Sequence, residues 1–436
     1  MNATEAEIHE KLSVTESKVV ITVDLALEKI VQASRETTVK HIIGVSLAES
    51  MPCVIGTIYK WESKVKQENC VLFSEFLKAG QGKNVEYLEI KADAPAVIAY
   101  TGGTTGKAKG VLLSNRAANT IAFQYKYADK VLDFQKGESF LDTIPPFLAY
   151  GLFLGVHMVL CVGLENILCP DPTAEHFPQQ FLKYKPNHLS GGALHIEALM
   201  KNKKVQRTNL FFAKTIAYGG DGMNKSWETD TFHFLKEHHA PYGLMNGYGM
   251  TEMAGPVCTS NHKFPVMLPF FCNNIKILDI DTGEELGYDQ EGEICVSGPS
   301  MMMEYYKNPE ATREIIFEEN GTRWLRTGDL GHVTKEGYFR LTGRLKRILW
   351  SIGADKCAVV GRINGEKGYL VIAYVTLKAK DIGDNIEKEL RQLCRQELKE
   401  NSWPFEYHFV EKLPITGAGK IDFRTLEKWA ENSDSF

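Results

Sequence analysis

Residues 100–110, with the sequence YTGGTTGKAKG, constrain the fold of this chain more than any other stretch. They include four glycines, three threonines and two lysines, directly after the apolar run 95–99. Glycines let backbone N–H groups approach an anion, while threonines add hydroxyl donors and lysine adds charge. The pattern predicts a strand that ends in a phosphate-binding loop and leads to a helix over 114–127. A Gly/Thr-rich surface turn is the alternative.

The P-loop of NTPases is the obvious comparison for such a loop, and the spacing argues against it. A P-loop needs GxxxxGK followed by serine or threonine. Here Thr101 stands at the position of the first glycine, and Ala108 follows Lys107. Both the glycine and the hydroxyl that would bind magnesium are therefore missing.

Length and composition indicate an ordinary globular enzyme of two or three domains. The 436 residues are 44% hydrophobic and 24% charged, with a net charge of -5, so there is no basic excess for binding nucleic acid. Nine scattered cysteines without a CxxC pair predict reduced thiols rather than disulfides or a zinc site. The N-terminus is polar and charged, unlike a signal peptide, so we expect a cytoplasmic protein.

The apolar run 144–164 is long enough to be weighed as a membrane span, which needs about 20 residues. It contains Pro145 and Pro146, internal glycines and His157, and it has no basic flank. These features favour a buried helix, so we expect no stable membrane insertion.

Short apolar segments that end in polar or glycine-rich loops alternate with helical patterns along much of the chain. The strand-like segments are 18–23, 41–45, 187–193, 214–222 and 243–252. This alternation predicts an α/β fold with parallel sheets and with ligands at the strand ends. From residue 274 onward, short β-rich pieces predict a smaller antiparallel or barrel-like unit. A mixed segment follows, with a strand over 369–377 and a helix over 385–400.

Further segments have the residue types of a nucleotide site. Tyr248 offers a ring for stacking on a purine, and Glu252 offers a carboxylate for Mg²⁺. Asp329 lies in a turn where it can accept ribose hydroxyls, while Arg344 and Lys420 place positive charge beside glycines. Taken singly, each is better explained as an ordinary surface, core or turn residue. Their combination and their order along the chain indicate a nucleotide site more specifically than any one of them does.

Together these segments resemble the motif series of the adenylate-forming superfamily: acyl-CoA synthetases, nonribosomal adenylation domains and beetle luciferases. Six segments occur in the family's order: YTGGTTGKAKG, YGMTE, GEICVSG, WLRTGDL, GRLKR and LPITGAGKID. They most resemble the motifs of bacterial acyl-CoA synthetases. The resemblance implies a large domain over 1–345, with parallel α/β sheets and a small distorted β-barrel. It also implies a small mobile α/β domain over 346–436. Compared with the family's pattern, we expect part of the N-terminal segment to be missing and the small domain to be shortened after Gly353, where the usual P-x-E-I-E element does not occur.

The resemblance also implies roles for individual residues. The ATP phosphates would be held by Thr101, Gly102, Gly103, Thr104, Thr105, Gly106 and Lys109. The adenine would be lined by Gly220, Asp221, Gly222, Asn246, Gly247 and Tyr248. Thr251 would contact phosphate, Glu252 would bind Mg²⁺, and Asp329 with Arg344 would hold the ribose. Lys420 would reach the carboxylate and α-phosphate oxygens during adenylation, and Lys346 would lie at the hinge.

Residues 145–151, PPFLAYG, correspond to a stretch in which amino-acid-activating members carry an aspartate. The stretch has no charge here, which favours a substrate without an amine. It also resembles the PLFHxxG element of acyl-CoA synthetases, with Leu148 at the histidine position. An apolar acyl pocket is one interpretation and core packing the other for Phe147, Leu148, Tyr150, Gly191 and Gly192.

The sequence therefore predicts ATP-dependent activation of a fatty or aryl acid to acyl-AMP, followed by transfer to the thiol of coenzyme A. The implied ligands are ATP, Mg²⁺, the acid and coenzyme A, and a homodimer is left open. One alternative is a stand-alone adenylation enzyme that loads a carrier protein. Another is a non-catalytic nucleotide- or acyl-binding homologue, although such a protein would need neither Glu252 nor Lys420.

Overall fold

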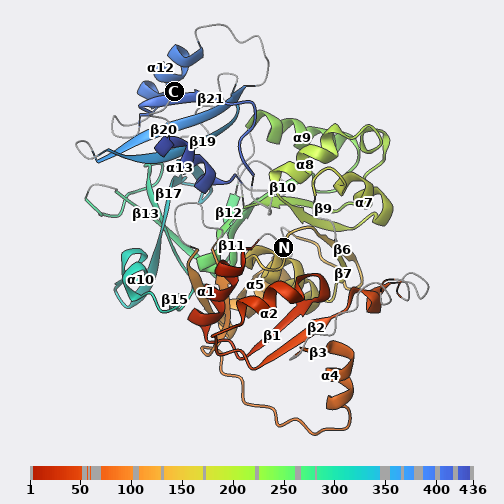
Figure 1. The fold of residues 1–436 in the computed structure, drawn as a ribbon. Coiled ribbons are helices and arrows are strands. Elements are labelled where there is room, and N and C mark those ends of the chain that lie inside the picture. The colour runs from red at the N-terminus through yellow and green to blue at the C-terminus, as the bar shows by residue number, and fades with distance from the viewer. Residues whose placement is uncertain are drawn as a thin grey trace. The chain divides into compact units, whose positions relative to one another are not determined.

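The computed structural model divides into two compact units, Met1–Glu89 and Ile90–Phe436, each considered by itself (Figure 1). The described residues are 3–51, 56, 59, 70–101, 108–128, 132–169, 173–220, 225–260, 267–279, 282–343, 354–364, 368–377, 386–397, 403–415 and 421–432. The predicted boundary between residues 345 and 346 lies outside these ranges, so that division stays a prediction.

The first unit is built on a three-stranded parallel sheet in the order β1-β2-β3. The strands are β1 (Val19–Val23), β2 (His41–Val45) and β3 (Cys70–Leu72), and the helical elements are α1 (Glu5–Thr15), η1 (Asp24–Ala26), α2 (Leu27–Ala33), η2 (Leu47–Ser50) and α4 (Phe73–Gly80). Leu27 and Ala33 of α2 are buried, as are Ile42 and Ile43 of β2. The predicted strands 18–23 and 41–45 are therefore confirmed, and α2 lies between them in the chain.

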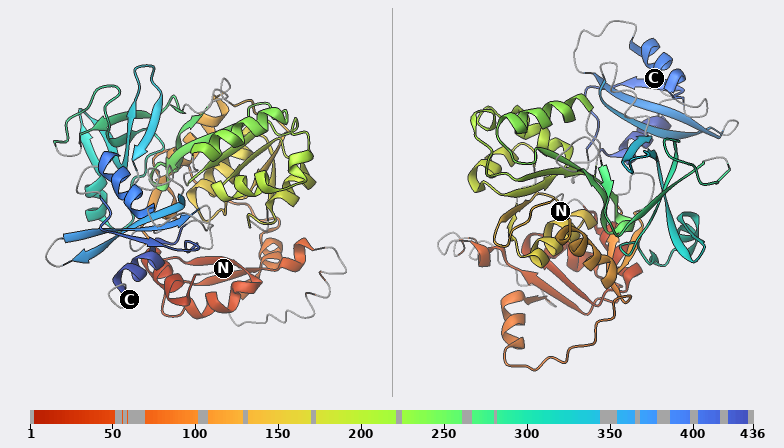
Figure 2. Two further views of the ribbon diagram at one scale, coloured as in Figure 1. Left: turned by 90° about the horizontal axis from the view of Figure 1, so that it is seen from above. Right: turned by 180° about the vertical axis from the view of Figure 1, so that it is seen from behind.

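The second unit contains the parallel sheet that the alternating pattern predicts. Its strands, β6 (Ser139–Asp142), β7 (Glu165–Leu168), β8 (His188–Gly191), β9 (Thr215–Gly219) and β10 (Leu244–Met250), lie in the order β7-β6-β8-β9-β10. The connecting helices are α7 (Phe177–Tyr184), α8 (Ala193–Lys201), η4 (Val205–Arg207) and α9 (Lys225–Glu237). Figure 2 shows α8 and α9 beside the strands of this sheet. Apolar side chains from these helices and strands form one core, so the strand ends are held in register.

Antiparallel strands continue this sheet beyond β10. They are β11 (Gly255–Ser260), β12 (Met267–Pro269), β13 (Asn274–Leu278), β14 (Gly292–Ser297), β16 (Ile316–Glu319), β17 (Thr322–Val333) and β18 (Phe339–Gly343). The order from β10 is β11-β12-β18-β17-β14-β13, with β16 paired to β17. The β-rich pieces predicted from residue 274 onward are confirmed, and β11 and β12 connect them to the parallel strands.

A short antiparallel sheet carries the glycine-rich loop. β4 (Pro95–Tyr100) pairs with β5 (Gly110–Ser114), which pairs on its other side with β15 (Glu304–Tyr305), next to α10 (Pro309–Ile315). The loop therefore joins two strands of a hairpin, and the sequence pattern missed β5. Helix α5 (Asn115–Lys126) follows, and its N-cap Ser114 accepts the Ala117 N–H at 3.1 Å.

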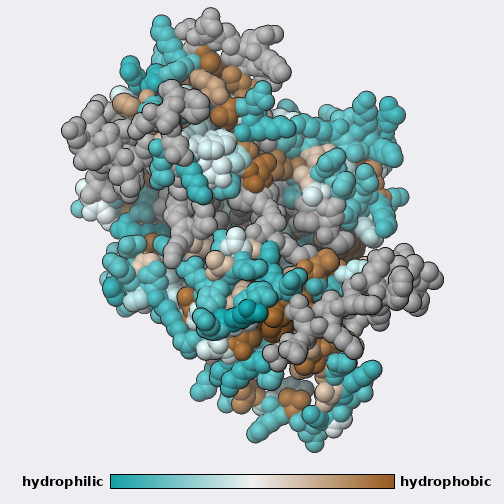
Figure 3. Space-filling view, viewed as in Figure 1, coloured by the Kyte–Doolittle hydropathy of each residue, from teal (hydrophilic) through white to brown (hydrophobic). Residues whose placement is uncertain are grey.

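The apolar run 144–164 forms the buried helix that was expected. It contains the π-helix η3 (Tyr150–Met158) and α6 (Val159–Val162). Phe153, Met158 and Val159 are almost fully buried. No helix in the described parts of the chain is long and apolar enough to cross a bilayer. The face in Figure 3 is mostly hydrophilic, with apolar residues in scattered groups.

The C-terminal segment forms a separate three-stranded sheet with β20 in the centre. The elements are β19 (Ala354–Asn364), β20 (Gly368–Leu377), α12 (Ile386–Glu397), β21 (Glu406–Phe409) and α13 (Phe423–Asn432). Leu390 and Cys394 of α12 belong to one apolar cluster, and Leu426 and Ala430 of α13 belong to another. The predicted strand and helix are confirmed, and the two helices cover different sets of sheet residues.

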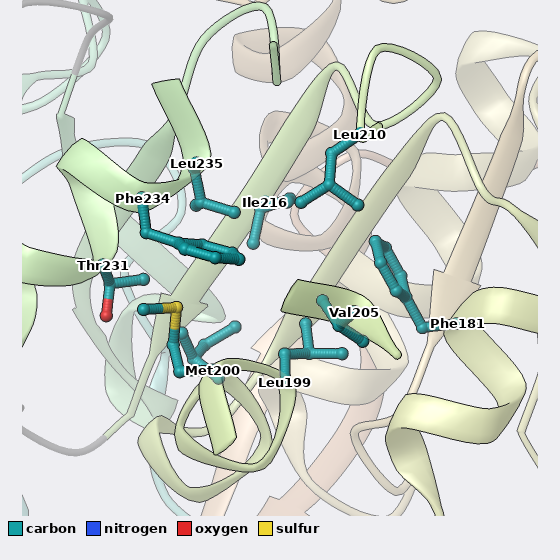
Figure 4. A pocket seen from close by; sticks show the side chains of 10 residues that line it. Phe181, Leu199, Met200, Val205, Leu210, Ile216, Thr231, Phe234 and Leu235 are labelled. Atoms are coloured by element: carbon teal, nitrogen blue, oxygen red, sulfur yellow. The ribbon is translucent and has the colours of Figure 1, made fainter. Parts of the chain in front are cut away.

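A small apolar pocket lies in the core between α7, α8, α9 and the sheet (Figure 4). Its lining includes Phe181, Leu199, Ile216 and Phe234, and Thr231 is its one polar residue. Thr231 is 0% exposed, and its hydroxyl has no hydrogen-bond partner within the described part of the chain. An unpaired buried hydroxyl lowers stability.

We expect Thr231→Val to raise the free energy of unfolding by about 1 kcal/mol, because valine keeps the shape and removes the unpaired hydroxyl. Chemical denaturation measures the change. Thr120→Val is the matched control, since Thr120 is buried in α5 but donates to the Arg116 carbonyl at 2.8 Å. The control should not be stabilised. A lower free energy of unfolding for the Thr231 variant would contradict the expectation.

Candidate active site

The described residues include only part of the predicted site. Of the predicted site residues, Gly102, Gly103, Thr104, Thr105, Gly106, Asp221, Gly222, Arg344, Lys346 and Lys420 lie outside the described ranges. Their roles stay predictions. The remaining residues fall on β8, β10, β17, η3 and η5 (Thr251–Met253), and in the loops beside β4, β5, β9, η3 and α8.

Thr101 and Lys109 close the base of the glycine-rich loop. The Thr101 N–H donates to the Lys109 carbonyl at 2.9 Å, and the Lys109 N–H donates to Thr101 Oγ1 at 3.1 Å. Tyr100 and Gly110 then face each other as partners in the β4–β5 ladder. This loop connects the two antiparallel strands of a hairpin, whereas a P-loop connects a strand to a helix. The structure thus agrees with the spacing argument against a P-loop.

Tyr305 connects two of the predicted site residues, and the sequence pattern did not single it out. The Lys109 Nζ lies 4.7 Å from the centre of the Tyr305 ring. The Tyr305 hydroxyl donates to Glu252 Oε1 at 2.6 Å, and both residues are buried. Burial and then the Glu252 carboxylate raise the pKa of Tyr305, which keeps the phenol protonated as a donor. Tyr305 therefore spans the distance between the loop lysine and the predicted magnesium ligand.

Backbone hydrogen bonds hold these three residues in place. The Tyr306 N–H donates to the Gly110 carbonyl at 2.7 Å, which sets β15 beside β5. The Met302 N–H donates to the Glu252 carbonyl at 2.7 Å, which sets η5 beside the segment that precedes β15. The positions of Lys109, Glu252 and Tyr305 are thus fixed by the main chain as well as by their own contacts.

The fold explains why position 249, in the YGMTE segment, is a glycine. The β10–β11 ladder shifts register between Tyr248 and Gly249. A Cβ on Gly249 would lie 2.2 Å from the Gly255 carbonyl oxygen, so any larger residue would push the strands apart. The close approach lets β10 turn into η5, which carries Thr251 and Glu252.

Tyr248 and Asp329, predicted to bind adenine and ribose, lie together although they are 81 positions apart in the sequence. The Tyr248 hydroxyl donates to Asp329 Oδ2 at 2.9 Å. Burial and then the Asp329 charge raise the pKa of Tyr248. Gly328 has a φ of 68°, which favours glycine just before Asp329. The Tyr248 ring lies 5.2 Å from the Phe339 ring, so one of its faces is already covered.

The other predicted adenine residues lie at the adjacent ends of β9 and β10. Asn246 and Gly247 pair in the ladder with Tyr218 and Gly219, and Gly220 directly follows β9. The Asn246 side chain donates to Glu228 Oε1 at 3.0 Å. Asn246 is therefore tied to α9, a contact that the local sequence did not indicate.

The predicted acyl-pocket residues are divided between two elements. Gly191 ends β8, and Gly192 is the N-cap of α8. Tyr150 begins η3, and its hydroxyl would lie 3.6 Å from a Cβ on Gly219. Phe147 is 67% exposed, so the core-packing alternative is wrong for this residue. The pocket itself stays a prediction.

Asp142 is a buried carboxylate that lies three positions before Pro145 and that the sequence pattern missed. It ends β6 and is 4% exposed. Its Oδ1 accepts the Ile144 N–H at 3.0 Å, and none of the described cations forms an ion pair with it. Burial raises the pKa of Asp142 to about 7. The sequence signal that could have identified Asp142 is an aspartate at the end of a strand, just before the PPFLAYG stretch.

Sequence comparisons place this chain in a known family. The profile of the AMP-binding enzyme family matches residues 1–306, and that of the AMP-binding enzyme C-terminal domain matches residues 353–420. Because the first match covers more than half of the 436 residues, the chain belongs to the AMP-binding enzyme family.

Individual relatives agree with this assignment. A long-chain-fatty-acid–CoA ligase of Salmonella typhimurium is 27% identical over 435 residues, covering 92% of this chain and 74% of the relative. A 4-coumarate-CoA ligase of Narcissus pseudonarcissus is 27% identical over 448 residues, covering 96% and 76%. The solved structure of a benzoate CoA ligase from Burkholderia xenovorans has a TM-score of 0.75 at 20% identity, covering 98% of this chain and 83% of that one. The structural match shows a shared fold.

We expect Asp142→Asn to stabilise the protein, and the gain to grow with pH. The pKa of Asp142 is about 7 in the folded protein against a reference value of 3.8, so folding favours the protonated carboxyl. That contribution is fully present below the unfolded pKa and is lost as the pH rises through about 7. Asparagine avoids this loss and still accepts the Ile144 N–H. We expect a gain of about 2 kcal/mol at about pH 8 and less at about pH 5.

Denaturant titrations of both proteins at the two pH values measure this difference. Asp93→Asn is the control, because Asp93 is exposed and pairs with Arg116 at 2.6 Å, which lowers the pKa of that carboxyl. The control should show no gain at either pH. An Asp142 effect that does not change with pH would contradict the assignment of the shift to this carboxyl.

Proposed function

We propose that this chain uses ATP to activate a carboxylic acid as an acyl adenylate and then transfers the acyl group to the thiol of coenzyme A. The observation that carries the proposal is the contact series Lys109–Tyr305–Glu252, which joins the base of the glycine-rich loop to a buried carboxylate. Family membership supports nucleotide chemistry, and the named relatives are CoA ligases of fatty and coumaric acids. The substrate class is therefore a fatty or aryl acid.

The reaction brings anions together, so charge neutralisation dominates its catalysis. The substrate carboxylate attacks the α-phosphorus of ATP, the bond from that phosphorus to the bridging oxygen breaks, and pyrophosphate leaves. The coenzyme A thiolate then attacks the acyl carbon and releases AMP. We assign Lys109 to the phosphates and Lys420 to the carboxylate and α-phosphate oxygens. The ribose hydroxyls donate to Asp329, whose position Tyr248 sets.

Glu252 fits the role of a magnesium ligand. Mg²⁺ bound with ATP takes one or two protein carboxylates, and phosphate and water oxygens complete its shell. Glu252 is a buried carboxylate in which Tyr305 binds Oε1, so Oε2 is the oxygen we assign to the metal. The described residues contain no group of three or more His, Cys, Asp or Glu side chains arranged to hold a metal, so a single-carboxylate site is the arrangement proposed. The ion would neutralise phosphate charge.

Pyrophosphate exchange with ATP across fatty and aryl acids tests the first half-reaction. Thioester formation with coenzyme A, compared with a phosphopantetheinyl carrier protein, tests the second. If exchange occurs but the thioester forms only on the carrier protein, the result would favour the stand-alone adenylation enzyme. ATP binding without exchange for any acid would favour the non-catalytic homologue and contradict the proposal. A cytoplasmic location and a homodimer stay predictions beside it.

We expect Lys420→Ala to slow pyrophosphate exchange by roughly 100-fold, because the variant loses a cation at the reacting oxygens. Thioester formation from supplied acyl adenylate should change little, since the α-phosphorus is no longer attacked in that step. Single-turnover measurements of each half-reaction check this. Equal losses in both halves would contradict the assigned role.

We expect Tyr305→Phe to raise the Mg²⁺ concentration needed for half-maximal exchange by roughly 10-fold, because it removes the donor that orients Glu252. Phenylalanine keeps a ring beside Lys109, so nucleotide binding without Mg²⁺ should be unchanged when it is measured by calorimetry. Tyr306→Phe is the matched control at the next position, where the ring lies 5.4 Å from the Lys307 Nζ. Equal Mg²⁺ requirements in both variants would contradict the orienting role of Tyr305.

A further inference from the structure

We propose that Asp142 lines the acyl-binding site and that the acid activated by this chain carries a hydroxyl or amino hydrogen-bond donor that reaches the Asp142 carboxylate. This inference rests on the proposed function and specifies its substrate class. The donor would belong to the acyl group, away from the reacting carboxylate.

Asp142 lies at the edge of the parallel sheet where ligands of such sheets bind. Asp142 is the last residue of β6, and ligands of α/β sheets bind at the carboxyl ends of the strands. It pairs in the parallel ladder with Ser190 of β8, so the two side chains lie on the same face of the sheet. Ser190 is 2% exposed and directly precedes Gly191, a residue of the predicted acyl pocket.

The contact with η3 places Asp142 on the side of Tyr150. In a π-helix the hydrogen bonds run from residue i to i+5, so Gly155 lies about one turn after Tyr150. A Cβ on Gly155 would lie 2.3 Å from Asp142 Oδ2, so the carboxyl packs directly against the helix backbone. Burial raises the pKa of Tyr150 to about 12, and the Asp142 charge adds to that shift. Tyr150 and Asp142 therefore share one environment.

The Asp142 carboxylate has hydrogen-bond acceptor sites that a ligand could use. An ionised carboxylate has about four acceptor sites, and the Ile144 N–H occupies one of them in the described structure. A turn that needs a single acceptor for one N–H can use asparagine, serine or threonine without burying a charge. Burying a carboxylate is costly, and groups in such surroundings are concentrated at binding sites. The structural role alone therefore does not account for the aspartate.

This carboxylate changes the inference about the substrate. The uncharged stretch 145–151 favoured an acid without an amine, but Asp142 lies just outside that stretch. A plain hydrocarbon acyl group would leave the buried carboxylate without a ligand partner. A site built to bind a donor rejects an analogue that lacks the donor far more strongly than an apolar pocket rejects an extra methylene. An ammonium or a hydroxyl would each supply the missing contact.

The test uses matched acids that differ in one group: benzoates and medium-chain fatty acids, each unsubstituted, hydroxylated or aminated. We expect the wild type to favour its best donor-bearing acid over the matched unsubstituted acid by more than roughly 10-fold in kcat/KM for pyrophosphate exchange. Asp142→Val should lose that preference. Asp142→Asn should lose it for an amine and keep part of it for a hydroxyl, which distinguishes the two donors.

Direct binding of each acid by calorimetry provides a second readout, and thermal unfolding confirms that the variants fold. Asp93→Asn serves as the control, because Asp93 is an exposed carboxylate that pairs with Arg116. The wild-type preference should survive in the control. No preference for donor-bearing acids in the wild type, or an unchanged preference in Asp142→Val, would overturn the inference while leaving the proposed function intact. Absence of exchange with every acid would instead overturn the proposed function, and calorimetry on the same acid pairs would still decide the role of Asp142.

Discussion

The hydrogen bond from Tyr305 to Glu252 is the interaction on which the candidate site depends. A buried carboxylate without a partner is costly, and a phenol that donates at 2.6 Å offsets that cost without adding charge. The same tyrosine ring lies under Lys109, so one side chain sets the spacing between a cation and an anion. Because β15, β5 and η5 are joined by main-chain hydrogen bonds, this spacing is a property of the fold.

Three buried carboxylates in the second unit show two different ways of being accommodated. Glu252 and Asp329 are 8% and 6% exposed, and each accepts a hydrogen bond from a tyrosine. Asp142 is 4% exposed and accepts one backbone N–H. Tyrosine hydroxyls fix the orientation of the first two, for which we propose a metal ion and ribose hydroxyls as ligands. Among the described residues, the third accepts a hydrogen bond from a backbone N–H and from no side chain, which is the state expected of a group whose main partner is the substrate.

Local patterns in the sequence predicted the strands, the strand-end glycines and the residue types of the site, because each depends on near neighbours. Strand β5 was missed because its identity depends on pairing with β4 and β15. Tyr305 was missed because nothing within its own segment shows that its partner lies 53 positions away. Asp142 was missed because the stretch compared with the family began at Pro145, while register places Asp142 beside Ser190. Long-range pairing decides all three, and single-sequence patterns do not encode it.

The two ends of the parallel strands show that this fold does not simply tolerate unpaired buried charge. At the amino ends of β6 and β8, Glu138 accepts from His188 at 2.8 Å and pairs with Lys214 at 2.5 Å. The Glu138 charge is thus matched by the Lys214 ammonium, while burial lowers the pKa of His188. At the carboxyl end of β6, Asp142 has no such match among the described residues. Since Lys214 matches the carboxylate at one end of the sheet and no described cation matches Asp142 at the other, the unmatched carboxylate is better explained by a ligand than by loose packing.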